Sequence, residues 1–152
     1  MADFPPLAQL YETARSTHID GPKLRAAVWR DFASDVGQWV LLGFGSWSVE
    51  ERATGALAGY IGLNAPPEYP ERELGWVMLE GFEGKGYAFE AASLARTFAF
   101  EALGWSGCVS YIDPENRRSI RLAERLGAVL DEKAATPNGD PCLVYRHMRV
   151  LS

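Results

Sequence analysis

A glycine-rich turn separates a strand-like segment from a helix-like segment near the middle of the chain, and it limits the possible folds more than any other feature. Residues 71–79 read as a strand, residues 80–86 contain three glycines, and residues 87–103 form an alanine-rich helical pattern that Gly104 ends. A helix that begins directly after such a turn presents unpaired N–H groups and its positive dipole end. The succession of strand, glycine-rich turn and helix therefore predicts an α/β fold with an anion-binding site at residues 83–88.

Two common phosphate-binding loops do not fit this segment. A Walker A loop fails because Lys85 is followed by Gly86 instead of Ser or Thr, and because Leu79 takes the place of the first glycine. A dinucleotide-binding fingerprint fails because Phe89 stands where a third small residue is required. The glycines alone leave a plain tight turn as an open alternative.

The segments before the turn show two helical patterns followed by three strand patterns. A first helix is expected over residues 7–14, and Gly21–Pro22 is expected to open a second helix. The apolar face of that second helix repeats every four residues, at Leu24, Val28, Phe32 and Val36. Strands are expected at residues 46–51, 56–63 and 71–79.

The segments after the turn continue the alternation. A strand is expected at residues 107–112, and Asn116 is a good N-cap for a helix that runs to Leu126. Residues 128–130 and 142–150 are expected to pair as a final hairpin around a turn at residues 136–140. This order predicts one domain over residues 1–152, an α/β fold in which helices cover the faces of a mixed sheet.

Charge, apolar runs and cysteine content limit the expected binding partners and the expected cellular location of the protein. The formal net charge of −5 and the pI near 5.1 argue against a nucleic-acid partner. No apolar run reaches transmembrane length, and the first residues resemble no secretory leader, so we expect a cytoplasmic protein without a membrane partner. Cys108 and Cys142 fit no metal spacing, and we expect two free thiols and no metal.

Three segments in a fixed order resemble the GNAT superfamily of acetyl-CoA-dependent N-acetyltransferases, with the Rim-type branch, named for enzymes that acetylate ribosomal-protein N-termini, as the nearest. They are Glu73–Leu79 (ELGWVML), Gly84–Ala91 (GKGYAFEA) and Asp113–Gly127 (DPENRRSIRLAERLG), and the resemblance covers roughly residues 3–149. It implies a central, mostly antiparallel sheet that splays between the strands at 73–79 and 107–112, with helices on both faces. The strand with which family members begin has no counterpart before the first helix, so the first edge strand is expected to be missing.

The resemblance also implies a site for acetyl-CoA, the expected cosubstrate. The family's pyrophosphate loop, Q/R-x-x-G-x-G/A, falls on Glu83, Gly86 and Ala88, so Glu replaces the usual Gln or Arg. Backbone N–H groups are then expected to hold the phosphates, at Gly84, Lys85, Gly86, Tyr87, Ala88 and Phe89. The backbone at Val77, Met78 and Leu79 is expected to pair with the pantetheine arm, which Asn116 would also contact unless it is only an N-cap. One arginine of the group Arg117, Arg118, Arg121 and Arg125 is a candidate for the 3′-phosphate.

The catalytic residues follow from the same resemblance. Many family members place a Tyr general acid at the position of Ala123, and Ser119, one helical turn earlier, is the expected substitute, with an ordinary exposed serine as the alternative. Glu73 is the expected general base, or else a carboxylate that only attracts a cationic amine. Glu71 ranks second as base, and Tyr60, Trp76 and Glu71 are expected to line the acceptor pocket.

These expectations describe direct acetyl transfer to a primary amine in a ternary complex. The acceptor stays open among a protein N-terminus, a polyamine, an aminoglycoside and an amino acid. A non-catalytic acyl-CoA-binding module on the same fold is the alternative, and a structural domain that binds no CoA is a third. The missing edge strand predicts either a homodimer that covers the edge at residues 46–51 or a coding start placed too far downstream.

Overall fold

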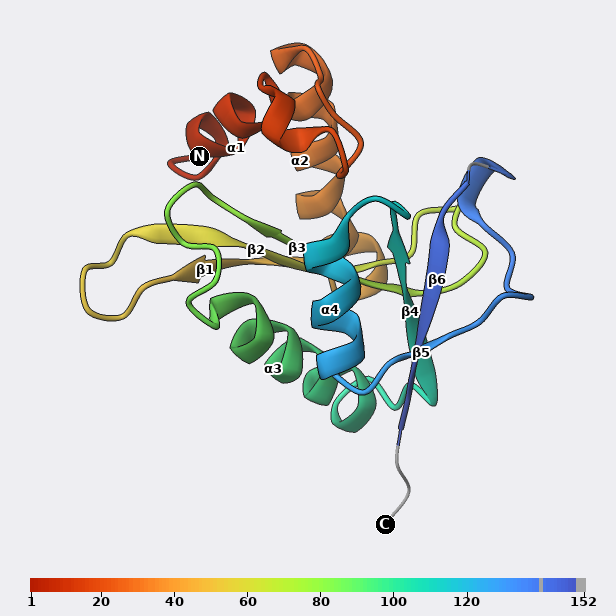
Figure 1. Ribbon diagram of the computed structural model, residues 1–152. Coiled ribbons are helices and arrows are strands. Elements are labelled where there is room, and N and C mark those ends of the chain that lie inside the picture. The colour runs from red at the N-terminus through yellow and green to blue at the C-terminus, as the bar shows by residue number, and fades with distance from the viewer. Residues whose placement is uncertain (140, 150–152) are drawn as a thin grey trace.

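The computed structural model describes residues 1–139 and 141–149, in which six strands form a sheet flanked by helices (Figure 1). The helices are α1 (Phe4–Tyr11), α2 (Arg25–Leu42), α3 (Tyr87–Glu101) and α4 (Arg117–Arg125). The strands are β1 (Ser46–Glu50), β2 (Leu57–Asn64), β3 (Glu73–Met78), β4 (Gly107–Ile112), β5 (Val129–Leu130) and β6 (Leu143–Met148). Short 3₁₀ turns span Ala14–Ser16 and Pro137–Gly139. Asp140 of the predicted hairpin turn and Val150 of the predicted last strand lie outside the described residues.

The sheet splays between its third and fourth strands, as predicted. The strand order is β1-β2-β3-β4-β6-β5, and every neighbouring pair is antiparallel except β3 and β4. Strands β2 and β3 pair along the whole of β3, whereas β3 and β4 pair only where Glu73 lies opposite Val109. Figure 1 shows the consequence, because β1–β3 lie side by side across the view while β4 and β6 stand at a steep angle to them. A wedge therefore opens along β3 beyond Glu73.

The second helix begins later than the sequence suggested. The chain folds back at Gly21, whose N–H donates to the Ser16 carbonyl and whose α-carbon lies so close to Ser16 that a Cβ would stand 2.0 Å from its hydroxyl. Gly21–Pro22 therefore does not open the helix, which starts at Arg25.

The predicted apolar face of α2 is only half correct. Val28 is buried and Phe32 is partly buried against α1, but Leu24 and Val36 are 82% and 56% exposed. Residues four apart advance by about 400° on a helix of 3.6 residues per turn, so each step drifts by about 40°. Leu24 precedes the helix and does not follow its periodicity, and the two steps from Val28 to Val36 turn the row by about 80°, which takes Val36 away from the core.

Helices cover both faces of the sheet, and each face has its own packing. On one face Ala92, Ala95 and Ala99 of α3 are buried against β2 and β3, and their small side chains allow the close packing that the sequence predicted. On the other face, α1 and the first half of α2 pack together around Phe4, Leu7, Ala8 and Val28, with Tyr60 of β2 beside them. The second half of α2 reaches the sheet, where the Trp39 indole N–H donates to the Ser46 carbonyl and the Gln38 amide lies against Asn64, and a cavity opens between α2 and strands β2 and β3.

Candidate functional site

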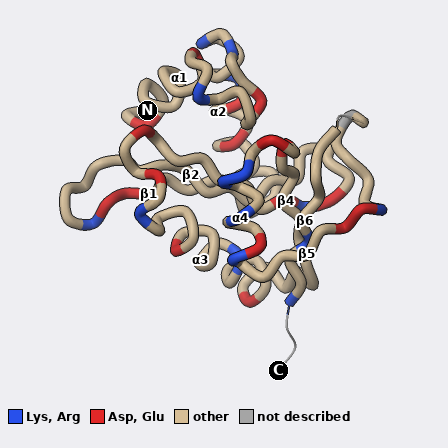
Figure 2. The backbone as a smooth tube through the Cα atoms, in the orientation of Figure 1, with Lys and Arg blue, Asp and Glu red and all other residues tan. Residues whose placement is uncertain are grey.

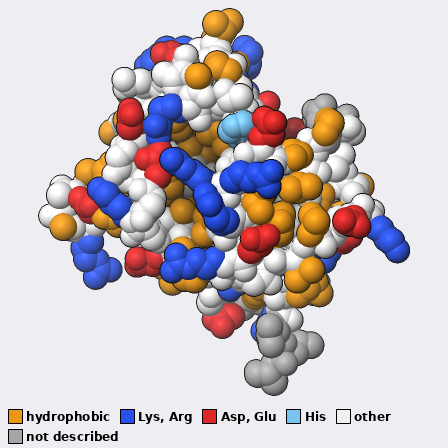
Figure 3. Space-filling model, viewed as in Figure 1, with side chains coloured by type: hydrophobic (Ala, Val, Ile, Leu, Met, Phe, Trp, Pro, Cys, Tyr) orange, Lys and Arg blue, Asp and Glu red, His pale blue; other side chains and the backbone are white. Residues whose placement is uncertain are grey.

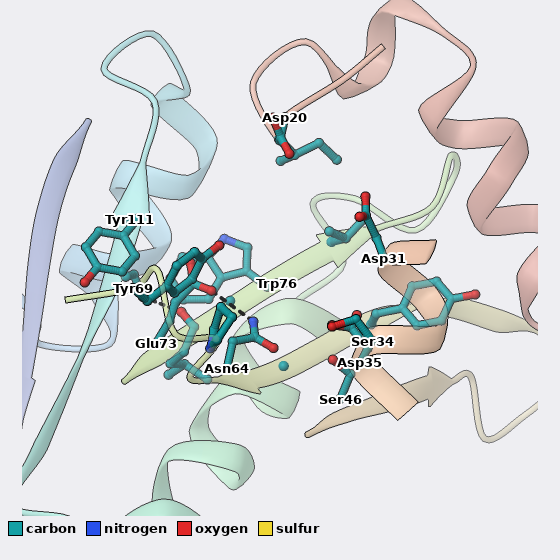
Figure 4. A pocket seen from close by; sticks show the side chains of 18 of the residues that line it. Asp20, Asp31, Ser34, Asp35, Ser46, Asn64, Tyr69, Glu73, Trp76 and Tyr111 are labelled. Atoms are coloured by element: carbon teal, nitrogen blue, oxygen red, sulfur yellow. Dashed lines mark hydrogen bonds between the residues drawn. The ribbon is translucent and has the colours of Figure 1, made fainter. Parts of the chain in front are cut away.

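A cavity of about 780 Å³ lies between α2 and the exposed face of β2 and β3 (Figure 4). Its walls come from α1, α2, the segment between them, β1–β3, the end of β4 and the start of α4. The volume falls within the range of small-molecule sites, about 300–1,000 Å³. Four residues that the sequence predicted for catalysis or acceptor binding line it together: Tyr60, Glu73, Trp76 and Ser119.

Glu73 lies where β3 and β4 separate. Its carboxylate accepts a hydrogen bond of 2.9 Å from the Asn64 side-chain amide and a second from the backbone N–H of Tyr111. Burial raises the pKa of Glu73 to about 7, and the two hydrogen bonds oppose this shift only in part. A carboxyl group with this pKa can accept a proton near neutral pH.

Trp76 and Ser119 bridge the mouth of the wedge. The indole N–H of Trp76, on β3, donates a hydrogen bond of 3.0 Å to the Ser119 hydroxyl, in the first turn of α4. The side-chain oxygen of Asn116 accepts from the Ser119 backbone N–H at 3.1 Å, which confirms the predicted N-cap. Ala123 is fully buried, so its position offers no group to the cavity. Tyr60 also lines the cavity and donates its hydroxyl proton to the backbone carbonyl of Asp3.

The structure corrects the placement of Glu71, which does not line the cavity. Its two carboxylate oxygens accept from the Arg146 guanidinium at 2.6 and 2.8 Å, and these hydrogen bonds lower the pKa of Glu71. Because β3 begins only at Glu73, Glu71 is outside the strand and does not follow its alternation. Glu71 is therefore neither a second base nor part of the acceptor pocket.

The backbone groups that face the wedge are also not those predicted. The N–H of Leu79 donates to the Ala58 carbonyl of β2, and its carbonyl accepts from Phe82. Hydrogen-bonded pairs alternate along an antiparallel ladder, and Val77, opposite Tyr60, lies two residues from Leu79. Its backbone groups therefore also point to β2. The carbonyl of Leu74 instead accepts from Ser110 of β4, which places the backbone of Trp76 and Met78 at the open edge. Of the three predicted residues, only Met78 faces the wedge with its backbone.

The glycine-rich turn lies outside the cavity, at the start of α3. Gly84 and Gly86 adopt φ values of +74° and +90°, a region that favours glycine. The first helical hydrogen bond runs from Glu90 to Gly86. Within the described chain, the backbone N–H groups of residues 86–89 make no hydrogen bond, so they are available to an anion.

Two arginines neutralise Glu83, the residue that departs from the family's loop. Its carboxylate forms an ion pair with Arg15, which lies 68 residues away in the sequence, and Arg118 of α4 approaches to 3.9 Å. The same carboxylate accepts from the N–H of Gly81 at 3.0 Å. Basic side chains gather over α4 and the adjoining loop (Figures 2 and 3). The sequence contains no local signal for the Arg15–Glu83 contact.

The two histidines serve structural contacts. His147 is buried, its Nε2 lies 3.0 Å from the Ser110 hydroxyl, and burial lowers its pKa to about 4. His18 lies 2.8 Å from Asp113 at the rim of the cavity. Among the described residues, no group of three or more His, Cys, Asp or Glu side chains is placed to hold a metal ion, and no helix is long and apolar enough to cross a membrane.

Comparison with known proteins identifies relatives of this fold. The acetyltransferase (GNAT) domain model matches residues 1–129. The uncharacterized protein YkkB of Bacillus subtilis (strain 168) is 32% identical over 88 residues, which are 56% of this chain, and the match spans only about half of that relative (51%).

Two solved structures are similar over nearly the whole chain. The crystal structure of the acetyltransferase from Agrobacterium tumefaciens str. C58 is 42% identical, with a TM-score of 0.94, over 98% of this chain and 86% of that one. RimL, a ribosomal L7/L12 alpha-N-protein acetyltransferase solved with coenzyme A, is 18% identical with a TM-score of 0.74, over 97% of this chain and 89% of that one. The second likeness shows the fold alone, so the Rim-type branch stays a prediction. On the domain match, the chain belongs to the acetyltransferase (GNAT) domain family.

Proposed function

We propose that the protein transfers an acetyl group from acetyl-CoA directly to a primary amine. The observation that carries this proposal is the position of Glu73, a carboxyl group with a pKa raised to about 7 at the point where the cavity meets the wedge between β3 and β4. Membership of the GNAT family supports acetyl-CoA as the donor.

The coenzyme would lie along the wedge. The free N–H groups of residues 86–89 suit the pyrophosphate, and the open backbone edge at Trp76 and Met78 suits the amides of the pantetheine arm. Asn116 and Ser119 stand on the opposite side of the wedge, at the start of α4. This arrangement would bring the thioester near Ser119 and leave the cavity for the acceptor.

Glu73 would take the proton that the amine must lose. The amine nitrogen attacks the acetyl carbon, the carbon–sulfur bond breaks, and CoA leaves as a thiolate. The proton released from the nitrogen passes to Glu73, directly or through one water. Ser119 would donate its hydroxyl proton to the thiolate and recover it from water. The transfer would proceed without a covalent intermediate on Cys108, which is buried and whose pKa is raised by that burial.

A non-catalytic acyl-CoA-binding module is the second candidate. Glu83 in the phosphate loop and Ala123 at the usual Tyr position favour it. A protein N-terminus, the acceptor of a Rim-type enzyme, remains a further candidate acceptor, and its support is the fold shared with RimL.

Two measurements test the proposal together. Isothermal titration with acetyl-CoA should show binding, and a free-thiol assay should show CoA release that depends on added amine. Binding without release under any amine would favour the non-catalytic module. The Glu73→Gln variant serves as the control, because it should bind acetyl-CoA normally and release thiol at a greatly reduced rate.

A further inference from the structure

We propose that the acceptor is a small linear diamine or polyamine, whose second positively charged amino group is bound by Asp35 of α2 while its reacting amine lies at Glu73. This inference rests on the proposed function and names the substrate class of the same site.

The cavity is strongly acidic. Six carboxylate side chains line it, and they are Asp20, Asp31, Asp35, Glu68, Glu73 and Asp113. Lys23 is the one lysine or arginine among the lining residues, and its ammonium is already bound to Asp20 at 2.5 Å and to Asp31 at 2.8 Å. Asp113 is paired with His18. The lining therefore has more negative charge than its own cations neutralise.

Two of these carboxylates are half-buried and form no ion pair among the described residues. Glu73 rises from β3, and Asp35 points into the cavity from α2 (Figure 4). Asp35 accepts hydrogen bonds only from neutral groups, the Gln38 amide at 3.3 Å and the Ser46 hydroxyl. Two carboxylates on opposite walls are thus held in place without a cation.

Amide side chains join these two carboxylates across the floor of the cavity. The Gln38 amide nitrogen donates to Asp35 and also to the Asn64 oxygen, at 3.3 and 3.4 Å. The Asn64 nitrogen in turn donates to Glu73 at 2.9 Å. The chain fixes the two carboxylates relative to each other, so one elongated molecule can reach both.

The cost of burying these carboxylates points to a cationic occupant. Burial raises the pKa of Asp35 to about 6 and that of Glu73 to about 7, and the charge of Asp35 adds to the shift of Glu73. A cation bound between them would remove this repulsion and restore the ionised form of both groups. A single ammonium group satisfies one carboxylate, whereas a diamine satisfies both.

The remaining walls suit the hydrocarbon part of such a molecule. Aromatic rings contribute to the lining from several elements, and they are Tyr11, Phe32, Trp39, Trp47, Tyr60, Tyr69, Trp76 and Tyr111. Apolar walls between two polar ends match a methylene chain between two amino groups. The cavity volume suits a small molecule better than a folded protein.

Matched acceptors test the proposal. The free-thiol assay would compare 1-aminopentane, 1,5-diaminopentane, spermidine and a short peptide with a free N-terminus and no lysine. We expect the diamine and spermidine to exceed the monoamine at least tenfold in kcat/KM, chiefly through KM. Equal values for monoamine and diamine, or a preference for the peptide, would overturn the proposal.

Variants locate the second charge. Asp35→Asn should raise KM for the diamine about tenfold, and any effect on the monoamine, through the loss of the Asp35 charge that raises the pKa of Glu73, should fall equally on both amines, so the ratio of their kcat/KM values should fall about tenfold. Asp35→Glu should keep most of the diamine preference because it keeps the charge. Glu50→Gln, on exposed β1 and outside the cavity, makes the same change in net charge and controls for the overall field.

Calorimetry separates failure of this inference from failure of the proposed function. Titration of 1,5-diaminopentane into the protein with bound CoA should show binding that Asp35→Asn weakens, whether or not acetyl transfer occurs. Thiol release with every amine at similar efficiency would retain the proposed function and refute the diamine. Diamine binding without thiol release would refute the enzyme and retain this site.

Discussion

The indole N–H of Trp76 donates a hydrogen bond of 3.0 Å to the hydroxyl of Ser119, and this contact joins the open edge of β3 to the first turn of α4. The hydroxyl oxygen is thereby occupied as an acceptor, so its proton is free to be donated elsewhere. In the proposed reaction that proton faces the sulfur of the departing CoA.

Ser119→Ala should therefore lower kcat by at least tenfold and leave acetyl-CoA affinity nearly unchanged. Trp76→Phe should lower kcat less, because the hydroxyl remains and loses only its orientation. Steady-state kinetics and calorimetry on both variants measure the two effects. Full turnover in Ser119→Ala would mean that CoA leaves as the thiolate or takes its proton from water.

Glu73→Gln should reduce kcat by about 10²–10⁴-fold at saturating amine, the usual contribution of a general base. The rate of the unmodified enzyme should rise with pH through an apparent pKa near 7, and this rise should disappear in the variant. If Gln at this position raises only the KM for the amine, Glu73 acts by attracting the cation and not as a base.

Thermal stability provides the control for that variant. The folded-state pKa of Glu73 is raised to about 7 from 4.5, so the folded protein favours the protonated form and loses stability as pH rises through this range. Glutamine cannot ionise, so Glu73→Gln should have a higher Tm than the unmodified protein. The difference should be small near pH 4.5 and reach its full size above about pH 7, at roughly 2–4 °C for each kcal/mol added to the free energy of unfolding. Loss of turnover with a raised Tm would show that the variant is folded.

Gly86→Val should weaken acetyl-CoA binding at least tenfold, about 1.4 kcal/mol. Gly86 has a φ of +90° and precedes the free N–H groups of α3, so a branched residue strains the turn and blocks the approach of a phosphate. Gly104→Val is the matched control, since Gly104 also has a positive φ, of +68°, and lies beyond the other end of α3. Calorimetry should show lost affinity in the first variant alone.

Arg15 and Glu83 should have opposite effects on coenzyme binding. Arg15→Gln leaves the Glu83 carboxylate less neutralised beside the phosphates, so acetyl-CoA affinity should fall about threefold to tenfold at low salt. Glu83→Gln removes the negative charge and frees Arg15 and Arg118, so affinity should rise by a similar factor. The two effects should shrink at high salt, because both are electrostatic. If the change in acetyl-CoA affinity of the double variant is simply the sum of the two single changes, the phosphates do not bind beside this ion pair.

A homodimer through the β1 edge is the remaining prediction. Among the described strands β1 pairs with β2 alone, and the end of α2 nearby exposes Val40 and Leu41 by 86% and 81%. Both features suit a second copy of the chain. Sedimentation should show a dimer that Leu41→Glu dissociates, whereas Leu94→Glu, on exposed α3, should leave it intact. A monomer in the unmodified protein would contradict the prediction.

Local sequence patterns were sufficient for much of the fold. The alanines of α3, the Asn116 cap and the glycines before α3 act within one or two helical turns, so their structural roles follow from neighbouring residues alone. The same short reach explains the failure at α2, where the four-residue repeat keeps Val28 and Phe32 on the buried face but has turned away from it at Val36.

The chemistry of the site depended on contacts between distant segments. Which backbone groups of β3 face the wedge was decided by its register with β2, and a shift of one residue would exchange Val77 for Met78. Glu71 and Glu73 are equivalent in the sequence, but packing binds the first to Arg146 and leaves the second without a cation. Asp35 faces Glu73, and Arg15 meets Glu83, only because α1 and α2 fold over the sheet. Local residue patterns were enough to specify most of the helices and strands and the family motifs. The electrostatic environment of each carboxyl group was set by long-range packing, because burial and ion pairing depend on segments far apart in the chain.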